Sequence, residues 1–141
     1  MRVVLDTNTL VSAVLSPNGP PRRLLDAARN QVFELCSSPV LLAELLDVVT
    51  REKFAKRFQA AGLTPLGIVK EIRRMAYMVA PTNVPRVIVS DADDDQVLAC
   101  AVAGQADLIV SGDKHLHTLG GSYQGIPIVR SAQAMAMVGA G

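Results

Sequence analysis

The chain has no tryptophan, few other aromatic residues and only two cysteines among its 141 residues. Because aromatics make up 4% of a chain that is 50% hydrophobic, we expect a core built from Val, Leu, Ile, Ala and Met. Cys36 and Cys100 lie isolated in apolar stretches without a metal-binding spacing. We therefore expect two buried, reduced thiols rather than a disulfide.

Long apolar runs are also missing. No run approaches the roughly 20 residues that a membrane-spanning helix needs. Asp6 interrupts the first apolar stretch, where a signal peptide would continue. We therefore expect a cytoplasmic protein with no membrane partner. The length suits one compact domain spanning residues 1–141, with 139–141 as a frayed tail.

The net charge of +1 gives no global sign of a nucleic-acid partner, but the basic residues are unevenly distributed. Residues 51–74 carry seven basic side chains against two acidic ones. The seven are Arg51, Lys53, Lys56, Arg57, Lys70, Arg73 and Arg74. Such a segment is suited to a polyanion, although a solvated helix surface is an equally good interpretation.

Short apolar strands alternate with helical patterning along the chain. Strands are predicted at 2–5, 32–36, 76–80, 108–111 and 126–129. Helices are predicted at 9–15, 21–30, 39–49, 51–60, 65–75, 97–104, 114–119 and 131–138. This alternation predicts an α/β fold, in which a central, mainly parallel sheet of about five strands is covered by helices on both faces.

Acidic residues stand where the predicted strands end. Asp6 follows the first strand and Asp113 follows the strand at 108–111. Glu44 falls at the rim of the apolar stripe of its helix, whereas Asp47 falls on the opposite, solvated face. The carboxyl ends of parallel strands form the crevice where such sheets bind ligands. Carboxylates gathered there repel one another unless a cation lies among them, and oxygen ligands favour Mg²⁺ or Mn²⁺.

A denser acidic cluster precedes the helix at 97–104. It contains Asp91, Asp93, Asp94 and Asp95. Acids at a helix start are favoured by the helix dipole, so part of this cluster could serve only that purpose.

Taken in order, these segments resemble the PIN-domain ribonucleases, including the toxins of VapBC-type toxin–antitoxin pairs. The matching segments are Val4-Leu5-Asp6-Thr7-Asn8, Ser37-Ser38-Pro39 with Glu44-Leu45, Asp47 to Phe54, Asp91 to Ala99, and Val110-Ser111-Gly112-Asp113. The first is similar to the family's D-T-N turn and the last to its T/S-x-D signature. The resemblance covers nearly the whole chain and implies a PIN-like three-layer α/β/α sandwich.

By this resemblance, the catalytic and metal-binding acids are Asp6, Glu44, Asp95 and Asp113, which would hold one or two Mg²⁺ or Mn²⁺ ions. Asp95 is preferred as the third acid because it lies eighteen residues before Asp113, at the helix start. Asp94 is the alternative for that position, and Asp91 is expected to assist. Asn8 and Ser111 are expected to support the site by hydrogen bonds.

The resemblance implies a metal-dependent endoribonuclease, acting as a toxin that a cognate protein antitoxin neutralises. It also implies a homodimer or a higher homo-oligomer. Arg51, Lys53 and Lys114 are proposed RNA contacts. His115 and His117 lack metal-binding partners in the sequence, so we expect them on the surface.

Two other functions compete with this interpretation. One is a non-catalytic RNA- or protein-binding module on the same fold. The other, more remote, is a haloacid-dehalogenase-type phosphatase, which needs a second Asp two residues after the nucleophile. Asn8 occupies that position here.

Overall fold

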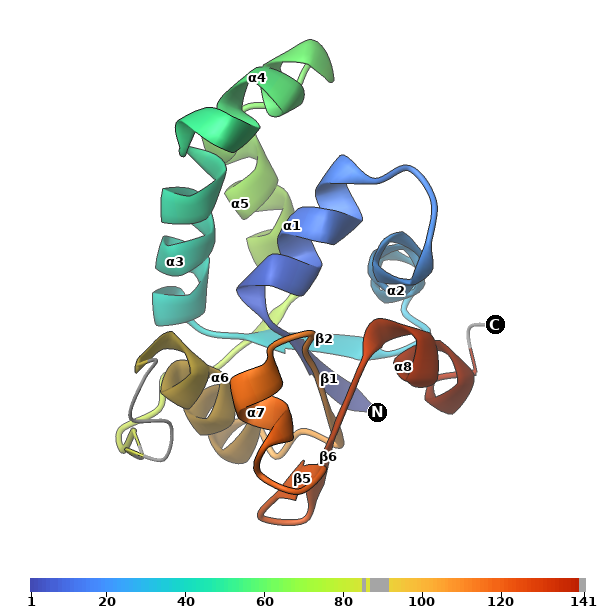
Figure 1. The fold of residues 1–141 in the computed structure, drawn as a ribbon, viewed down its shortest axis with the longest axis vertical. Helices are drawn as coiled ribbons and strands as arrows, with labels where there is room; N and C mark the ends of the chain where they lie inside the picture. Colours follow the sequence, from blue (N-terminus) through green and yellow to red (C-terminus); the bar gives the residue numbers. More distant parts are fainter. Residues whose placement is uncertain (85, 87–91, 140–141) are drawn as a thin grey trace.

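A six-stranded sheet forms the centre of the computed structural model, which describes residues 1–84, 86 and 92–139 (Figure 1). The strand order is β3-β2-β1-β4-β6-β5. The strands are β1 (Arg2–Leu5), β2 (Glu34–Ser37), β3 (Tyr77–Met78), β4 (Leu108–Val110), β5 (Ser122–Tyr123) and β6 (Ile126–Val129). All neighbouring pairs are parallel except β5 with β6, so the expected mainly parallel sheet is confirmed.

The sixth strand, β5, was not predicted from the sequence. It is only two residues long and pairs with β6 through a tight hairpin. Gln124 and Gly125 form the turn, and both have positive φ angles, of 49° and 79°. Two successive positive φ angles are typical of a two-residue hairpin turn, which glycine accommodates without strain.

Helices cover both faces of the sheet and complete a three-layer α/β/α arrangement (Figure 1). The helices are α1 (Thr7–Leu15), α2 (Pro20–Arg29), α3 (Pro39–Val49), α4 (Glu52–Ala60), α5 (Pro65–Met75), α6 (Ala92–Ala103), α7 (Lys114–His117) and α8 (Ser131–Met137). Their bounds agree with the predicted helices to within a few residues, except that α6 begins inside the acidic cluster.

Alternate residues of each strand enter different halves of the core. Val3 and Leu5 pack with α1, α2, α3, α5 and α8, whereas Val4 packs with α6 and α7 on the other face. In β4, Val110 and Ile109 divide in the same way. Since successive side chains of a strand point to opposite faces, a continuous apolar run is the pattern that a sheet buried on both faces requires.

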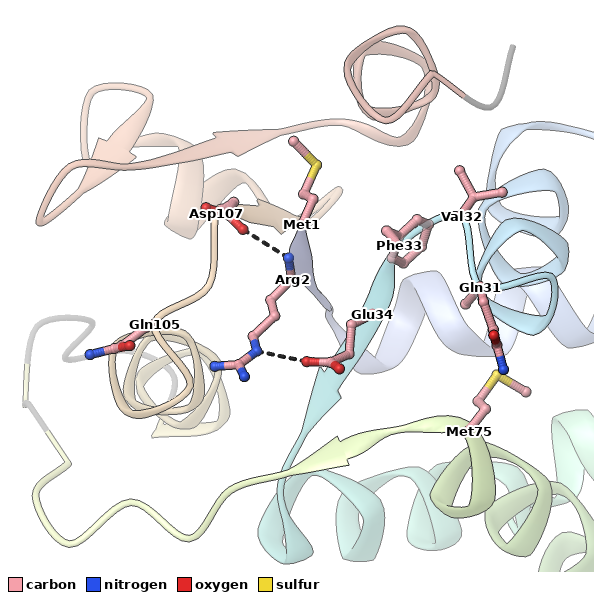
Figure 2. A pocket seen from close by; sticks show the side chains of 10 residues that line it. Met1, Arg2, Gln31, Val32, Phe33, Glu34, Met75, Gln105 and Asp107 are labelled. Carbon is pink, nitrogen blue, oxygen red and sulfur yellow. Dashed lines mark hydrogen bonds and ion pairs between the residues drawn. The ribbon is translucent and has the colours of Figure 1, made fainter.

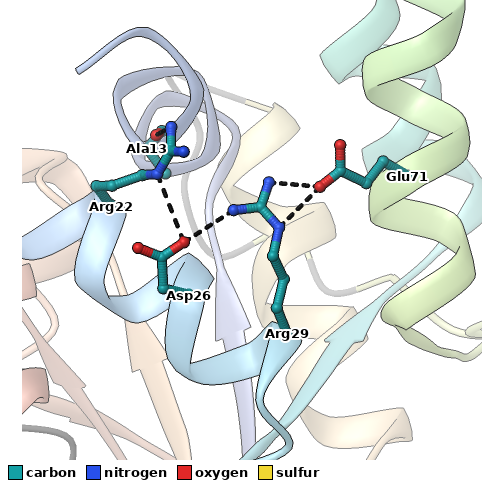
Figure 3. A network of polar contacts seen from close by, with 5 residues as sticks. All are labelled: Ala13, Arg22, Asp26, Arg29 and Glu71. Carbon is teal, nitrogen blue, oxygen red and sulfur yellow. Dashed lines mark hydrogen bonds and ion pairs between the residues drawn. The ribbon is translucent and has the colours of Figure 1, made fainter. Parts of the chain in front are cut away.

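A network of charged side chains joins α2 to α5 (Figure 3). Arg29 lies at its centre, with Nη1 2.8 Å from Asp26 Oδ1 and with both Nε and Nη2 donating to Oε1 of Glu71. Arg22 contacts Asp26 from the preceding turn, at 3.5 Å. These side chains are one-third to one-half exposed, so each pair contributes about 1 kcal/mol or less.

The two cysteines are both buried and free, as expected, but they are not isolated from each other. Cys36 Sγ on β2 lies 3.9 Å from Cys100 Sγ on α6. The hydrogen bond from Cys100 holds the pKa of the Cys36 thiol below its ordinary value, and the same contact, together with burial, raises the pKa of Cys100. Gly104 packs directly over this pair, where a Cβ atom would come within 2.4 Å of Cys36 Sγ.

Within the described part of the chain, the helices are too short or too polar for one of them to cross a membrane.

Candidate metal centre

The carboxyl ends of β1 and β4 bring Asp6 and Ser111 together. The two strands are parallel neighbours, and the backbone N–H of Asp6 donates to the carbonyl of Val110 at 3.1 Å. The next residue along, Ser111, donates its hydroxyl to Oδ2 of Asp6. Residues 105 positions apart in sequence therefore meet at one edge of the sheet.

Asp6 has two structural roles. Its side chain is buried, at 5% exposure, and Oδ1 accepts a hydrogen bond from the backbone N–H of Thr9 at 2.8 Å. This bond caps α1, a common role for Asp at the start of a helix. The other oxygen faces Ser111, and the side chain also lines a small pocket. Capping thus fixes the carboxylate at the pocket instead of removing it from the site.

Ser111 connects Asp6 to the next acid of the site. It is completely buried, and its Oγ accepts a hydrogen bond from the backbone N–H of Asp113 at 2.9 Å. Asp113 Oδ1 in turn accepts from the backbone N–H of His115 at 2.7 Å and caps α7. One serine hydroxyl therefore orients two carboxylate-bearing residues at once.

Helix α3 contributes Glu44. The helix begins after Ser38, whose Oγ accepts from the backbone N–H of Leu41 at 3.2 Å, with Pro39 in the first turn. Glu44 lines the pocket, whereas Asp47 is 71% exposed and pairs with Arg51 at 3.1 Å. This separation of an inward Glu from an outward Asp is the one that the apolar stripe of the helix predicts.

Helix α6 contributes Asp94. Asp94 is 5% exposed and lines the pocket together with Val97, one helical turn further on. Asp95 is also buried, at 6%, but it is not among the pocket-lining residues. Of these two candidates for the third acidic position, Asp94 is the one among the described pocket-lining residues. Asp91 lies outside the described residues, as does the side chain of Asp93.

The resulting pocket is small, with a volume of about 40 Å³. It is lined by Asp6, Thr7, Asn8, Glu44, Asp94, Val97 and Asp113. Four separate segments supply its acids: the β1–α1 junction, α3, α6 and the residue before α7. Asn8 is exposed at the opening of the pocket.

The side chain of His115 is 40% exposed, in line with the expected surface position, but its ring lies next to this acidic group. Its Nδ1 lies 3.3 Å from Asp113 Oδ1 and 3.9 Å from Asp94 Oδ2. Potential ligand atoms of Asp94, Asp113 and His115 all lie within 4.8 Å of one another. The spacing of residues in the sequence does not signal this position, because it depends on the cap that Asp113 forms on α7.

The residues proposed to contact RNA lie at different places. Lys114 is exposed at the start of α7, directly after Asp113. Arg51 and Lys53 lie beyond the far end of α3, and Lys53 Nζ stacks over the ring of Phe54 at 4.9 Å. Since a helix rises about 1.5 Å per residue, Arg51 is on the order of 10 Å along the helix axis from Glu44.

A larger hollow lies at the opposite, amino-terminal end of the central strands (Figure 2). It has a volume of about 620 Å³, but its charged groups largely pair with one another. Arg2 Nε donates to Glu34 at 2.6 Å, and the backbone N–H of Arg2 donates to Asp107 at 2.8 Å. The acidic pocket is far smaller, yet it is the one at the strand ends where α/β sheets place their chemistry.

Comparison with known sequences identifies the family. Residues 2–115 match the family described as PIN domain, and the chain belongs to that family. The uncharacterized protein MJ1680 of Methanocaldococcus jannaschii is 29% identical over 119 residues, which cover 84% of this chain and 75% of that protein. No solved structure gives a significant match.

Family membership gives the chain a nuclease-type fold, and PIN domains usually bind Mg²⁺ or Mn²⁺. The residues at the pocket fit such an ion. The donor set consists mainly of carboxylate oxygens, which hard divalent cations prefer. In addition, His115 Nδ1 is buried and has no hydrogen-bond partner among the described residues. A cation would satisfy this nitrogen and offset the repulsion among the neighbouring carboxylates.

Proposed function

We propose that the protein is an endoribonuclease that hydrolyses RNA phosphodiester bonds with the help of one or two Mg²⁺ or Mn²⁺ ions. The observation that supports this proposal is the convergence of Asp6, Glu44, Asp94 and Asp113 on one pocket at the strand ends of a PIN domain. These four residues would hold the metal. When bound, the metal would lower the pKa of water and offset negative charge on the phosphate.

The other residues of the site keep this acidic group in place. Ser111 fixes Asp6 and the backbone of Asp113 through its two hydrogen bonds. The hydrogen bonds that cap α1 and α7 hold the carboxylates of Asp6 and Asp113 in place as well. A site with preset carboxylates does not need to rearrange when it binds a cation, which favours affinity and precise positioning.

The pocket size favours recognition of the RNA backbone over recognition of a base. A volume of about 40 Å³ exceeds the ~10–15 Å³ that a water molecule needs but is far below that of a nucleobase pocket. The substrate would therefore lie across the opening, with only its scissile phosphate near the acids. Asn8 is exposed at the pocket and Lys114 is exposed directly after Asp113, so both are suited to contact the sugar–phosphate chain.

A pair of variants on α3 tests this proposal. We expect Glu44→Gln to reduce metal-dependent cleavage of a mixed single-stranded RNA by at least about a hundredfold, since it removes a ligand from the ion that carries the catalytic charge. Asp47→Asn makes the same change in charge on the exposed face of the same helix and should retain activity. Equal loss in both variants, or full activity in Glu44→Gln, would contradict the proposed site.

The proposal extends to a toxin role in the cytoplasm, with a protein antitoxin as partner and a homodimer as the active form. The support for this extension is the resemblance to toxin nucleases. Induced expression should arrest growth of a bacterial host, and Glu44→Gln should relieve the arrest. Light scattering of the purified protein would give the mass of the assembly. A monomer, or a host that grows normally with active enzyme, would contradict the extension but leave the nuclease proposal intact.

A further inference from the structure

His115 is not among the pocket-lining residues, but its own backbone holds it beside two of them, Asp94 and Asp113. Its N–H donates to Oδ1 of Asp113 at 2.7 Å, in the first turn of α7. This bond limits where the imidazole ring can go. The ring accordingly lies with Nδ1 3.3 Å from Asp113 Oδ1 and 3.9 Å from Asp94 Oδ2.

Nδ1 of His115 is buried although the side chain as a whole is 40% exposed. Nδ1 lies close to both carboxylates, but it makes no hydrogen bond to either of them. A neutral nitrogen whose lone pair faced two carboxylates would be repelled by them, and a cation shared by all three groups would turn the repulsion into attraction.

His117, on the same short helix, provides a useful contrast. Its Nε2 lies 2.7 Å from the backbone carbonyl of Ser111, at hydrogen-bonding distance. The ring of His117 therefore has an ordinary structural partner. Of the two histidines, His115 is the one whose inward nitrogen lacks such a partner among the described residues.

We propose that His115 is a metal ligand through Nδ1 and that it makes this centre a mixed nitrogen–oxygen site that favours Mn²⁺ over Mg²⁺. The inference rests on the proposed function, because it assumes that the acidic pocket binds a divalent ion. Mg²⁺ prefers oxygen ligands, whereas imidazole is a good ligand for transition metals. A nitrogen ligand at His115 would therefore shift the preference of this mainly carboxylate site from Mg²⁺ towards Mn²⁺.

Spin-echo electron paramagnetic resonance of the Mn²⁺-loaded protein tests this assignment without any measurement of activity. Manganese bound to imidazole shows echo modulation from the ligand nitrogen. We expect this modulation in the wild type and in His117→Gln, and its loss in His115→Gln. Calorimetry should show that His115→Gln weakens Mn²⁺ binding by at least about tenfold, the loss that even groups supporting a ligand commonly cause.

A second variant, His115→Asp, distinguishes loss of the nitrogen ligand from misfolding of α7. His115→Asp keeps a ligand of the oxygen type, so it should still bind Mn²⁺ without nitrogen modulation. Its ratio of Mn²⁺ to Mg²⁺ affinity should fall below that of the wild type.

The outcomes separate the two proposals. Mn²⁺ binding to the wild type without nitrogen modulation, or modulation that persists in His115→Gln, would overturn the role of His115 and leave the nuclease proposal standing. In that case Nδ1–H is a donor to Asp113 after a small ring rotation. Failure of the wild type to bind either ion would overturn both.

Discussion

Replacement of two buried serines by alanine should have very different consequences. Ser111 and Ser37 are 0% and 2% exposed, and both lie at strand ends. Ser111 donates to the carboxylate of Asp6 and accepts from the backbone of Asp113, whereas Ser37 Oγ has no hydrogen-bond partner among the described residues. Similar burial with different bonding makes the two substitutions a matched pair.

The expected cost of Ser111→Ala follows from its two bonds. Loss of the bond to a buried carboxylate costs about 1.5–3 kcal/mol, and the N–H of Asp113, which is only partly buried, adds a contribution of up to about 1 kcal/mol. We therefore expect a loss of about 2–4 kcal/mol. At about 3 °C per kcal/mol for a chain of this size, the melting temperature should fall by roughly 6–12 °C.

Ser37→Ala should leave stability unchanged or raise it by up to about 1 kcal/mol, since it removes a buried hydroxyl that makes no hydrogen bond. Urea unfolding in EDTA, followed by circular dichroism, measures both variants in the absence of metal. A loss below about 1 kcal/mol for Ser111→Ala, or an equal loss for Ser37→Ala, would show that the two hydrogen bonds of Ser111 do not stabilise the fold.

Two further pairs of variants test separate parts of the structure. Asp94→Asn should abolish the rise in melting temperature on addition of Mn²⁺, whereas Asp95→Asn should retain most of it, because of these two residues Asp94 is the one that lines the pocket. Loss of the rise in Asp95→Asn, with the rise kept in Asp94→Asn, would instead identify Asp95 as the third acid. Gly104→Ala should destabilise the protein by about 1–3 kcal/mol, because its Cβ would overlap the buried Cys36 thiol and crowd the carbonyl of Cys100, so these groups would have to move. Gly112→Ala is the control, because a Cβ there would meet no atom within 4 Å, and it should change the free energy of unfolding by less than about 0.5 kcal/mol. A similar loss of stability in both variants would show that the packing over Cys36 is not the cause.

The parallel core of the fold could be predicted from the sequence, because its strands are short continuous apolar runs separated by helical segments. The runs at 3–5 and 108–110 are buried on both faces, so apolar residues fill consecutive positions. The hairpin strand β5 could not be predicted in this way. Ser122 and Tyr123 are too few to show a period, and their pairing is set by the turn that follows.

Prediction of the acidic pocket depended on topology more than on local sequence. Once β1 and β4 are parallel neighbours, Asp6 and Asp113 must lie at the same edge of the sheet. The helical period likewise predicted that Glu44 faces the pocket and that Asp47 faces solvent. The choice between Asp94 and Asp95 depended on the exact phase of α6, which consecutive acids at a helix start cannot reveal.

The position of His115 could not be inferred from residue spacing. Two histidines two residues apart show no metal-binding pattern in the sequence. Only the cap that Asp113 forms on α7, together with the approach of α6, brings Nδ1 of His115 near two carboxylates. Contacts of this kind depend on side-chain orientation at a helix start, which the order of residues does not specify.

Cleavage of single-stranded RNA by the purified protein in Mn²⁺, Mg²⁺ or EDTA, beside an identically prepared Asp6→Asn variant, shows whether the acidic pocket is a catalytic metal centre. The variant keeps the capping oxygen of Asp6 but loses its charge, so it should fold and bind metal poorly. We predict cleavage by the wild type with either metal, none in EDTA and none by the variant. Cleavage that persists in EDTA, or that the variant retains in full, would contradict a metal centre at this pocket.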